Sequence, residues 1–154
     1  MAEQQAASFN IEKLYVKDLS LELPNAPQVF MQTESPQLDV QIHNESQPVT
    51  DTLYEVVVTA TVTAKAGEKT MFLAEVAQAG LFSIVNVPAE ELEPLLGIGC
   101  PTILYPYVRE AISDLVTRGG FPPVVLAPVS FEALYMQRQQ EEGKGQQPRI
   151  ETAH

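Results

Sequence analysis

The amino-acid sequence predicts an α+β fold in which a four-stranded antiparallel sheet carries helices on one face. Residues 10–84 show the two-residue alternation of apolar and polar side chains that is typical of strands. After residue 86 the apolar residues recur at three- and four-residue steps, which is the period of a helix. The chain lacks both the strand–helix–strand alternation of a parallel sheet and any internal repeat. Strands followed by helices therefore favour an antiparallel sheet.

The first predicted strand runs from Asn10 to Leu23 and has apolar residues on both of its faces. Side chains alternate between the faces of a strand, so this pattern indicates partial burial on both sides or a β-bulge. Pro24 and Pro27 end the strand because neither can donate a ladder hydrogen bond.

The second and third strands have clearer alternation. Leu38, Val40 and Ile42 alternate with polar residues, which predicts a half-buried strand. Residues 53–64 carry apolar side chains at even positions and several threonines at odd ones, and both valine and threonine favour strands.

The fourth strand is predicted over residues 69–84, after a short hairpin loop at residues 66–68. It is apolar on both faces, whereas an antiparallel strand usually exposes one face to water. We therefore expect its outer face to be covered as well, by another subunit.

The last two predicted helices are joined by an apolar loop. Gly119 and Gly120 stop the long helix, and Ser130 is a predicted N-cap for the last one. The loop between them is unusually apolar for a surface connection, so it either covers a core or lines a docking place. The predicted helices are Ala89–Leu96, Pro101–Arg118 and Phe131–Gln140.

The domain organisation follows from length and composition. A chain of 154 residues has room for one sizeable core. We expect a disordered N-terminal lead over residues 1–9, a single domain over residues 10–140, and a disordered polar tail over residues 141–154.

The net charge of −11 narrows the classes of partner. Nucleic acids and anionic membranes are bound by clustered Lys and Arg, so both are excluded as partners, and a basic partner is favoured. No secretory signal and no membrane-spanning stretch is evident, and a single cysteine forms no intrachain disulfide. We expect a cytoplasmic protein that does not insert into membranes.

The sequence offers no convincing catalytic set. Gly97–Gly99 lacks the third glycine of a dinucleotide loop, and His43 lies on the polar side of its strand. Cys100 precedes Pro101 at a predicted helix start, where the helix terminus could lower its pKa, although a lone cysteine is usually a small buried residue. The glutamates within residues 90–93 suit a helix N-terminus. We expect no enzyme activity, no cofactor and no metal.

Several sequence blocks, occurring in the same order, resemble the SecB family of bacterial protein-export chaperones. The resemblance extends from Tyr15 to Tyr135. The blocks that carry it lie at residues 15–20, 24–27, 72–76, 81–84, 100–101, 103–110 and 126–131.

The resemblance implies a function and an assembly. Members of the family hold unfolded preproteins in long grooves and hand them to the motor ATPase SecA. Two subunits pair and two pairs stack, which makes the homotetramer a dimer of dimers. The absence of a nucleotide-binding motif agrees with a chaperone that needs no ATP.

The resemblance also implies which residues meet each partner. Acidic positions on the outer surface of the sheet, with one leucine between them, would contact the basic, zinc-carrying tail of SecA; these are Asp18, Glu22, Leu73 and Glu75. Alternating residues of the fourth strand would serve the tetramer contact; these are Ala74, Val76 and Gln78, and the family often has cysteine where this chain has Ala74. The zinc belongs to the motor, so none is assigned here.

A client groove is expected from apolar residues of the second strand, the long helix and the apolar loop; these are Leu38, Val40, Ile42, Tyr105, Tyr107, Phe121, Leu126 and Phe131. Plain core packing stays the alternative for each of these residues. Two other functions also stay open: an acidic adaptor that binds one folded partner through a sheet edge, and a thiol enzyme that uses Cys100.

Overall fold

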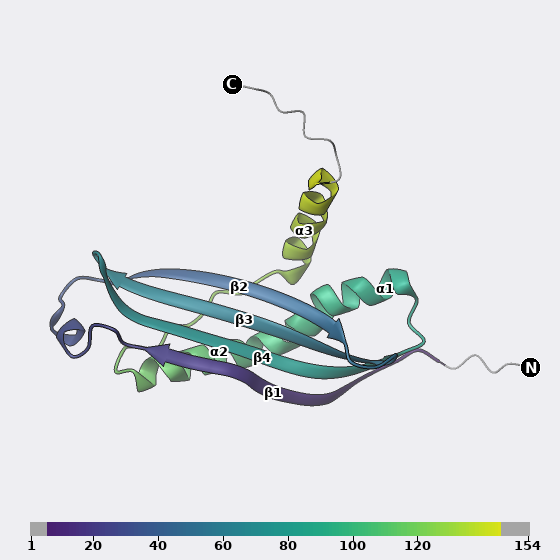
Figure 1. Cartoon of the computed structure of the whole chain (residues 1–154), viewed down its shortest axis with the longest axis horizontal. Coiled ribbons are helices and arrows are strands. Elements are labelled where there is room, and N and C mark those ends of the chain that lie inside the picture. Colours follow the sequence, from purple (N-terminus) through teal and green to yellow (C-terminus); the bar gives the residue numbers. More distant parts are fainter. Residues whose placement is uncertain (1–5, 146–154) are drawn as a thin grey trace, which may run out of the picture.

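A computed structural model describes residues 6–145 of the chain, and they form one sheet with helices (Figure 1). The sheet has four antiparallel strands in the spatial order β1-β4-β3-β2, so β1 and β2 are its edges. The α+β class and the antiparallel sheet predicted from the sequence are confirmed. The strands are β1 (Ser8–Glu22), β2 (Gln37–Pro48), β3 (Leu53–Ala66) and β4 (Lys69–Val85).

The helices follow the strands in the chain. Figure 1 shows α2 running across one face of the sheet and α1 lying past the edge formed by β2, while α3 projects away from the sheet. A short 3-10 helix, η1 (Gln28–Met31), connects β1 to β2. The remaining helical segments are α1 (Ala89–Pro94), the π-helical turn η2 (Leu95–Gly99), α2 (Cys100–Arg118) and α3 (Phe131–Gly145).

The predicted break between the first two helices is wrong. The backbone stays helical from α1 through η2 into α2, and both Gly99 and Cys100 have right-handed helical angles. Pro101 has no N–H to donate, and a π-helical turn is one way in which a helix accommodates a missing bond without ending. Cys100 therefore lies inside a continuous helical segment and not at an open helix N-terminus.

The end of α2 and the start of α3 agree with the sequence. Gly120 has a φ of 88°, a left-handed conformation that glycine adopts at little cost, and it follows the last turn of α2. The Ser130 hydroxyl accepts a hydrogen bond from the backbone N–H of Ala133 at 3.2 Å, as an N-cap does. However, α3 continues beyond the predicted end at Gln140 to Gly145. Of the predicted terminal segments, residues 1–5 and 146–154 lie outside the described part.

The core lies between α2 and the two central strands, β3 and β4. Gly80 lets the helix approach closely, because a Cβ at this position would lie 3.1 Å from a methyl group of Leu104. The largest fully buried side chains are Phe82, Leu104, Ile112, Val56, Val58, Val62, Val76, Val108 and Val116.

The outer face of β4 is partly covered by the chain's own side chains. Ala77 and Ala79 are buried on this face in a small cluster with Val57, and Tyr15 packs against it. The two alanines are small enough for a side chain from the neighbouring edge strand to lie across them. Within one chain this buries Ala77 and Ala79, whereas Leu73, Glu75 and Leu81 on the same face stay partly exposed, so cover by another subunit stays a prediction.

Candidate functional site

The outer face of the sheet brings the predicted SecA-binding residues together. In the pairing of β1 with β4, Glu22 lies opposite Leu73, Ser20 opposite Glu75 and Asp18 opposite Ala77. Glu22, Leu73 and Glu75 line one shallow hollow of about 240 Å³ together with Ser20, Thr61 and Ala74. Asp18 lies one step farther along the same face. Residues from two strands thus form one acidic surface, which we call the acidic face (Asp18, Glu22, Leu73 and Glu75).

A β-bulge places Asp18 on this face. The register of β1 shifts between Val16 and Asp18 and also between Ile11 and Lys13, so the bulge that the sequence left open is confirmed. Because a bulge adds one residue to a strand, Lys17 and Asp18 both reach the outer face although they are consecutive.

The charges of the acidic face are available to a partner. Glu75 accepts a hydrogen bond from the hydroxyl of Thr61 at 2.8 Å. Within residues 6–145, none of Asp18, Glu22 and Glu75 takes part in an ion pair. Asp18 and Glu22 are both exposed.

The residues predicted for the tetramer contact lie on the opposite face. Ala74, Val76 and Gln78 are 1%, 0% and 5% exposed, and the first two belong to the core beneath α2. Their register partners on β3 are Val62, Ala60 and Val58, which are core residues as well. All three side chains are thus covered within the single chain. Their role in a tetramer stays a prediction.

Three of the residues expected in a client groove lie in the core, the alternative that the sequence left open. Tyr105, Leu126 and Phe131 are 7%, 3% and 2% exposed. The Tyr105 hydroxyl donates a hydrogen bond to the carbonyl oxygen of Ala127, and its ring meets Phe131 edge-on with centroids 5.7 Å apart. The apolar loop is held against α2 by these contacts.

The other groove candidates are partly or largely accessible. Leu38 and Val40 of β2 are 47% and 43% exposed, although they lie on the helix-side face of the sheet with Ala64 and Val62, their register partners on β3. β2 is therefore less buried than its alternation of apolar and polar residues predicts, because α2 packs chiefly on β3 and β4. Ile42 is half-buried and Tyr107 is 47% exposed.

Phe121 is half-buried at the start of the apolar loop, between two other aromatic rings. Its ring centroid lies 5.3 Å from that of Phe30 and 5.0 Å from that of Phe72. Phe30 is 50% exposed, so this aromatic group extends the core to the surface.

A second apolar strip on the helix-side face was missed by sequence reasoning. It runs along β1, and its residues lie opposite Ile84, Phe82, Gln78 and Val76 of β4. The bulges hide this strip in the sequence, because each one shifts the parity of the residues that follow. We call it the β1 strip; its members are Phe9, Ile11, Val16 and Leu19, which are 36–50% exposed.

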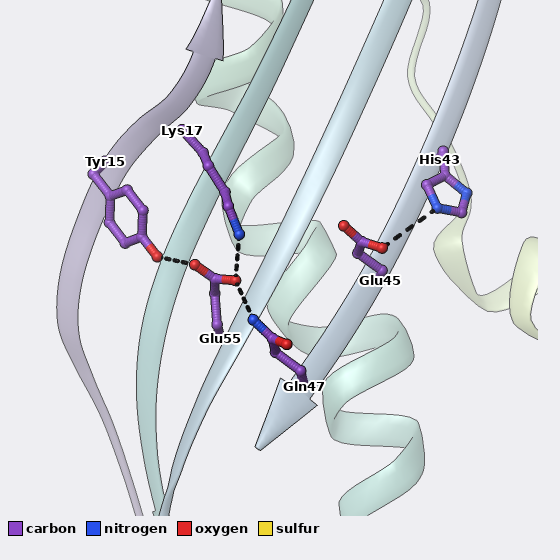
Figure 2. Close-up of polar contacts among 6 residues, drawn as sticks. All are labelled: Tyr15, Lys17, His43, Glu45, Gln47 and Glu55. Carbon is purple, nitrogen blue, oxygen red and sulfur yellow. Dashed lines mark hydrogen bonds and ion pairs between the residues drawn. The ribbon is translucent and has the colours of Figure 1, made fainter. Parts of the chain in front are cut away.

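A polar cluster on the outer face was also missed, and it is centred on Glu55 of β3 (Figure 2). The Glu55 carboxylate accepts hydrogen bonds from the Tyr15 hydroxyl, from Lys17 Nζ at 2.8 Å and from Gln47 Nε2 at 3.0 Å. Tyr15 and Lys17 reach it across β4, and Gln47 reaches it from β2. One buried carboxylate therefore ties together side chains from both edges of the sheet. A glutamate among valines and threonines in a strand was the available signal.

The charge states in this cluster follow from its contacts. The hydrogen bond from Lys17, and then that from Tyr15, lower the pKa of Glu55 below its ordinary value. Burial, followed by the hydrogen bond to Glu55, raises the pKa of Tyr15 to about 12. Glu55 is thus a carboxylate at neutral pH, and Tyr15 is a neutral donor.

Of the residues that the sequence offered as reactive groups, Cys100 is buried in the core and His43 is exposed on the sheet. Cys100 is fully buried, and burial raises the pKa of its thiol to about 12. Since the thiolate is the reactive form, this burial argues against the thiol-enzyme alternative. The His43 side chain is 70% exposed and lies 4.0 Å from Glu45 on the same strand.

Residues 6–145 contain no group of three or more His, Cys, Asp and Glu side chains that could hold a metal ion. No helix among them is long and apolar enough to cross a membrane.

The family profile and the curated relatives that match this chain all carry the name SecB. The sequence profile of the family described as preprotein translocase subunit SecB matches residues 2–142. Curated relatives named protein-export protein SecB include one from Methylobacillus flagellatus, 57% identical over 94% of this chain and 96% of its own length. Others are from Chromobacterium violaceum, 56% identical over 94% and 97%, and from Neisseria gonorrhoeae, 53% identical over 94% and 99%.

A solved structure supports the fold. The Rv1957 SecB-like chaperone of Mycobacterium tuberculosis, in complex with a ChAD peptide from the HigA1 antitoxin, matches with a TM-score of 0.64. The alignment covers 79% of this chain and 90% of that one at 20% identity. Because more than half of the residues are shared with curated relatives over nearly the whole length, this chain belongs to the SecB family of protein-export chaperones.

Proposed function

We propose that this protein is an ATP-independent chaperone that binds unfolded preproteins, keeps them competent for translocation and delivers them to the SecA motor ATPase. The observation that carries the proposal is the difference in width between the sheet and the helix α2 that covers it. The apolar face of the sheet is wider than α2, so apolar side chains on both edge strands stay accessible. The acidic face lies on the opposite side of the same sheet. Client and motor would thus use separate surfaces.

Holding a client requires many weak contacts. Burying one apolar side chain contributes about 1.5–3 kcal/mol, which is too little to hold a chain that loses its conformational freedom. We propose that Leu38, Val40, Ile42, Tyr107 and Phe121 supply such contacts, repeated by each subunit of a homotetramer. Connected sites on several subunits raise the effective concentration of each further contact. Because such sites recognise the unfolded state, binding draws the client away from folding.

Delivery requires a second kind of contact. The acidic face and the net charge of −11 suit the basic tail of SecA. Attraction between exposed charges is screened by salt, whereas apolar contacts are not. Binding of SecA should therefore weaken as the salt concentration rises, while binding of a client persists. We place this exchange in the cytoplasm, where SecA would collect the client.

The chaperone activity is tested by refolding a slow-folding preprotein with and without this protein, in the absence of nucleotide. We expect slower refolding at an equimolar amount of tetramer. An unchanged refolding rate would reject the proposal. Tight binding to a native protein, with none to its denatured form, would favour the acidic adaptor instead.

The site for SecA is tested by Asp18→Lys combined with Glu22→Lys. We expect weaker SecA binding, with the oligomer and client holding retained. A matched control is Glu90→Lys combined with Glu91→Lys, because it makes the same change of charge in the first turn of α1, away from the acidic face. Wild-type affinity in the first variant would overturn the site assignment.

A further inference from the structure

The outer face of the sheet carries a cation at the end of the acidic face, beside Asp18. Lys17 is adjacent to Asp18, and the bulge between Val16 and Asp18 places both side chains on the same face. A free ammonium group at this position would repel a basic partner. It would also compete for the carboxylates that such a partner needs.

Glu55 determines where that ammonium group lies. Lys17 Nζ contacts Glu55 Oε1 at 2.8 Å, and the Glu55 side chain is 10% exposed, against 46% for Lys17. Glu55 is paired with Leu81 on β4, whereas Asp18, the acidic-face residue next to Lys17, lies opposite Ala77, four residues away along the same strand. At about 3.3 Å per residue this separation is roughly 13 Å, which exceeds the screening length of about 8–10 Å at moderate salt. The contact therefore draws the lysine charge toward one end of the sheet and away from the acidic face.

The surroundings of Glu55 make it suited to this task. Ala77 and Ala79 leave room for the Tyr15 and Lys17 side chains to cross β4. Tyr15 and Gln47 donate the other two hydrogen bonds, so the carboxylate is fixed from both sides (Figure 2). Glu45, on the same face, is 64% exposed and lies near His43 instead.

We propose that Glu55 is a positioning residue, which holds the Lys17 ammonium group away from the acidic face and so keeps that face open to a basic partner. The inference rests on the proposed function, because it assigns a role to Glu55 at the surface proposed for SecA. Glu55 itself is too buried to be the contact. It acts through the lysine that it holds.

The test compares full-length Glu55→Gln with Glu45→Gln. Both remove one negative charge from the outer face, but only the first releases Lys17. The probe is a synthetic peptide rich in lysine and arginine, with affinity measured by calorimetry at low salt. We expect Glu55→Gln to weaken binding about two- to fivefold, the size expected for one surface ion pair, and Glu45→Gln to weaken it less. Equal losses in the two variants would overturn the proposal.

A rescue experiment separates positioning from a merely structural role. In Lys17→Gln with Glu55→Gln the released cation is absent, so affinity should return to the wild-type value. A double variant that binds as weakly as Glu55→Gln would show that the lysine is not the cause, and would also overturn the proposal. Circular dichroism and light scattering check that each variant keeps the fold and the oligomer.

A parallel measurement with SecA distinguishes this inference from the proposed function. If the basic peptide responds as expected but SecA binds neither the wild type nor any variant, the assigned partner fails and the role of Glu55 stands. If SecA binds the wild type and both single variants equally, the role of Glu55 fails and the partner stands. A wild-type protein with no affinity for the basic peptide contradicts the inference outright.

Discussion

Glu55 illustrates how the chemistry of a residue depends on its neighbours. A glutamate that is 8% exposed would be costly in a sheet unless its charge were compensated. Three donors from β1 and β2 compensate it here. With these three donors, the Glu55 carboxylate is compatible with its buried position on the outer face, as the valines are with the core.

The stability of this cluster should depend on pH in a defined direction. The pKa of Glu55 is lowered below its ordinary value of 4.5, so its stabilisation is fully present above that value and is lost as the pH falls through the folded-state pKa. We expect Glu55→Gln to lower the free energy of unfolding by about 1–3 kcal/mol at neutral pH. The difference from wild type should narrow on acidification, as measured by denaturant unfolding at several pH values. A difference independent of pH would contradict the assignment.

Tyr15 should report on the same cluster from the alkaline side. Its pKa is raised from the ordinary 10.0 to about 12, so its contribution to stability is complete below pH 10.0 and is lost as the pH rises through about 12. Burial also raises the pKa of Tyr105, so phenolate absorbance should show more than one late-titrating tyrosine, and one of these should disappear in Tyr15→Phe. Ionisation of every tyrosine near its ordinary pKa, before unfolding begins, would be inconsistent with the hydrogen bond to Glu55.

At the scale of elements, the distance between α2 and the sheet depends on one glycine. A Cβ on Gly80 would lie 2.7 Å from the Phe82 ring and 3.1 Å from Leu104, and both neighbours are fully buried. We expect Gly80→Val to destabilise the fold by about 1–3 kcal/mol, because the core cannot expand without moving the helix. Thermal or denaturant unfolding measures the change.

Gly143 provides the control for that substitution. Apart from its chain neighbours and the backbone of its own helix, no atom lies within 4 Å of a Cβ placed there, and the residue is exposed in α3. Gly143→Ala should leave stability unchanged or raise it slightly, since alanine favours a helix over glycine by about 0.8–1.0 kcal/mol. Equal losses in both variants would show that packing at Gly80 is not the cause.

The helix α3 packs against the rest of the fold through few contacts, so a single substitution can test its docking. The Tyr135 ring covers Gly97, where a Cβ would lie 2.7 Å from the ring, and the Arg138 guanidinium donates to the side-chain oxygen of Asn44. We expect Gly97→Val to speed amide hydrogen exchange in α3 while α2 stays protected. Gly99→Ala is the control, because its Cβ would meet only Leu95. Unchanged exchange in α3 would contradict this docking.

At the scale of the whole molecule, a single chain leaves apolar side chains accessible along both edges of the helix-side face of its sheet. The β1 strip and the residues Leu38 and Val40 flank α2 on the same side of the sheet. Monomeric proteins rarely expose continuous apolar surface of this kind unless a partner covers it. We propose that the β1 strip is covered in the homotetramer and that the β2 side serves clients.

The proposed assembly is tested by Val16→Asp combined with Leu19→Asp. Two charges on the β1 strip should reduce the mass measured by light scattering from that of a tetramer, because burying unpaired charges costs several kcal/mol per group. Met31→Asp is the control, because Met31 lies outside the β1 strip and is 84% exposed. A full tetramer in the double variant would exclude the β1 strip from the interface.

The sequence by itself determined the class of fold, the approximate extents of the strands, the glycine stop after α2 and the N-cap at Ser130. These features depend on local periodicity and on single residues, which are visible without neighbours. The family, too, was recognisable from ordered blocks of residues. The acidic surface could be named from that resemblance, although the tertiary structure was needed to bring Glu22, Leu73 and Glu75 into one hollow.

Only the tertiary structure decided which apolar residues are core and which are surface. Tyr105 and Tyr107 are two residues apart in one helix, yet the first is buried and the second is 47% exposed. The structure also joined α1 to α2, because a π-helical turn depends on hydrogen bonds between residues and not on composition. It revealed the contact of Glu55 with Lys17 across β4, since the order β1-β4-β3-β2 cannot be inferred from alternation along any one strand. Local patterns determine elements, whereas long-range pairing determines which surfaces remain accessible.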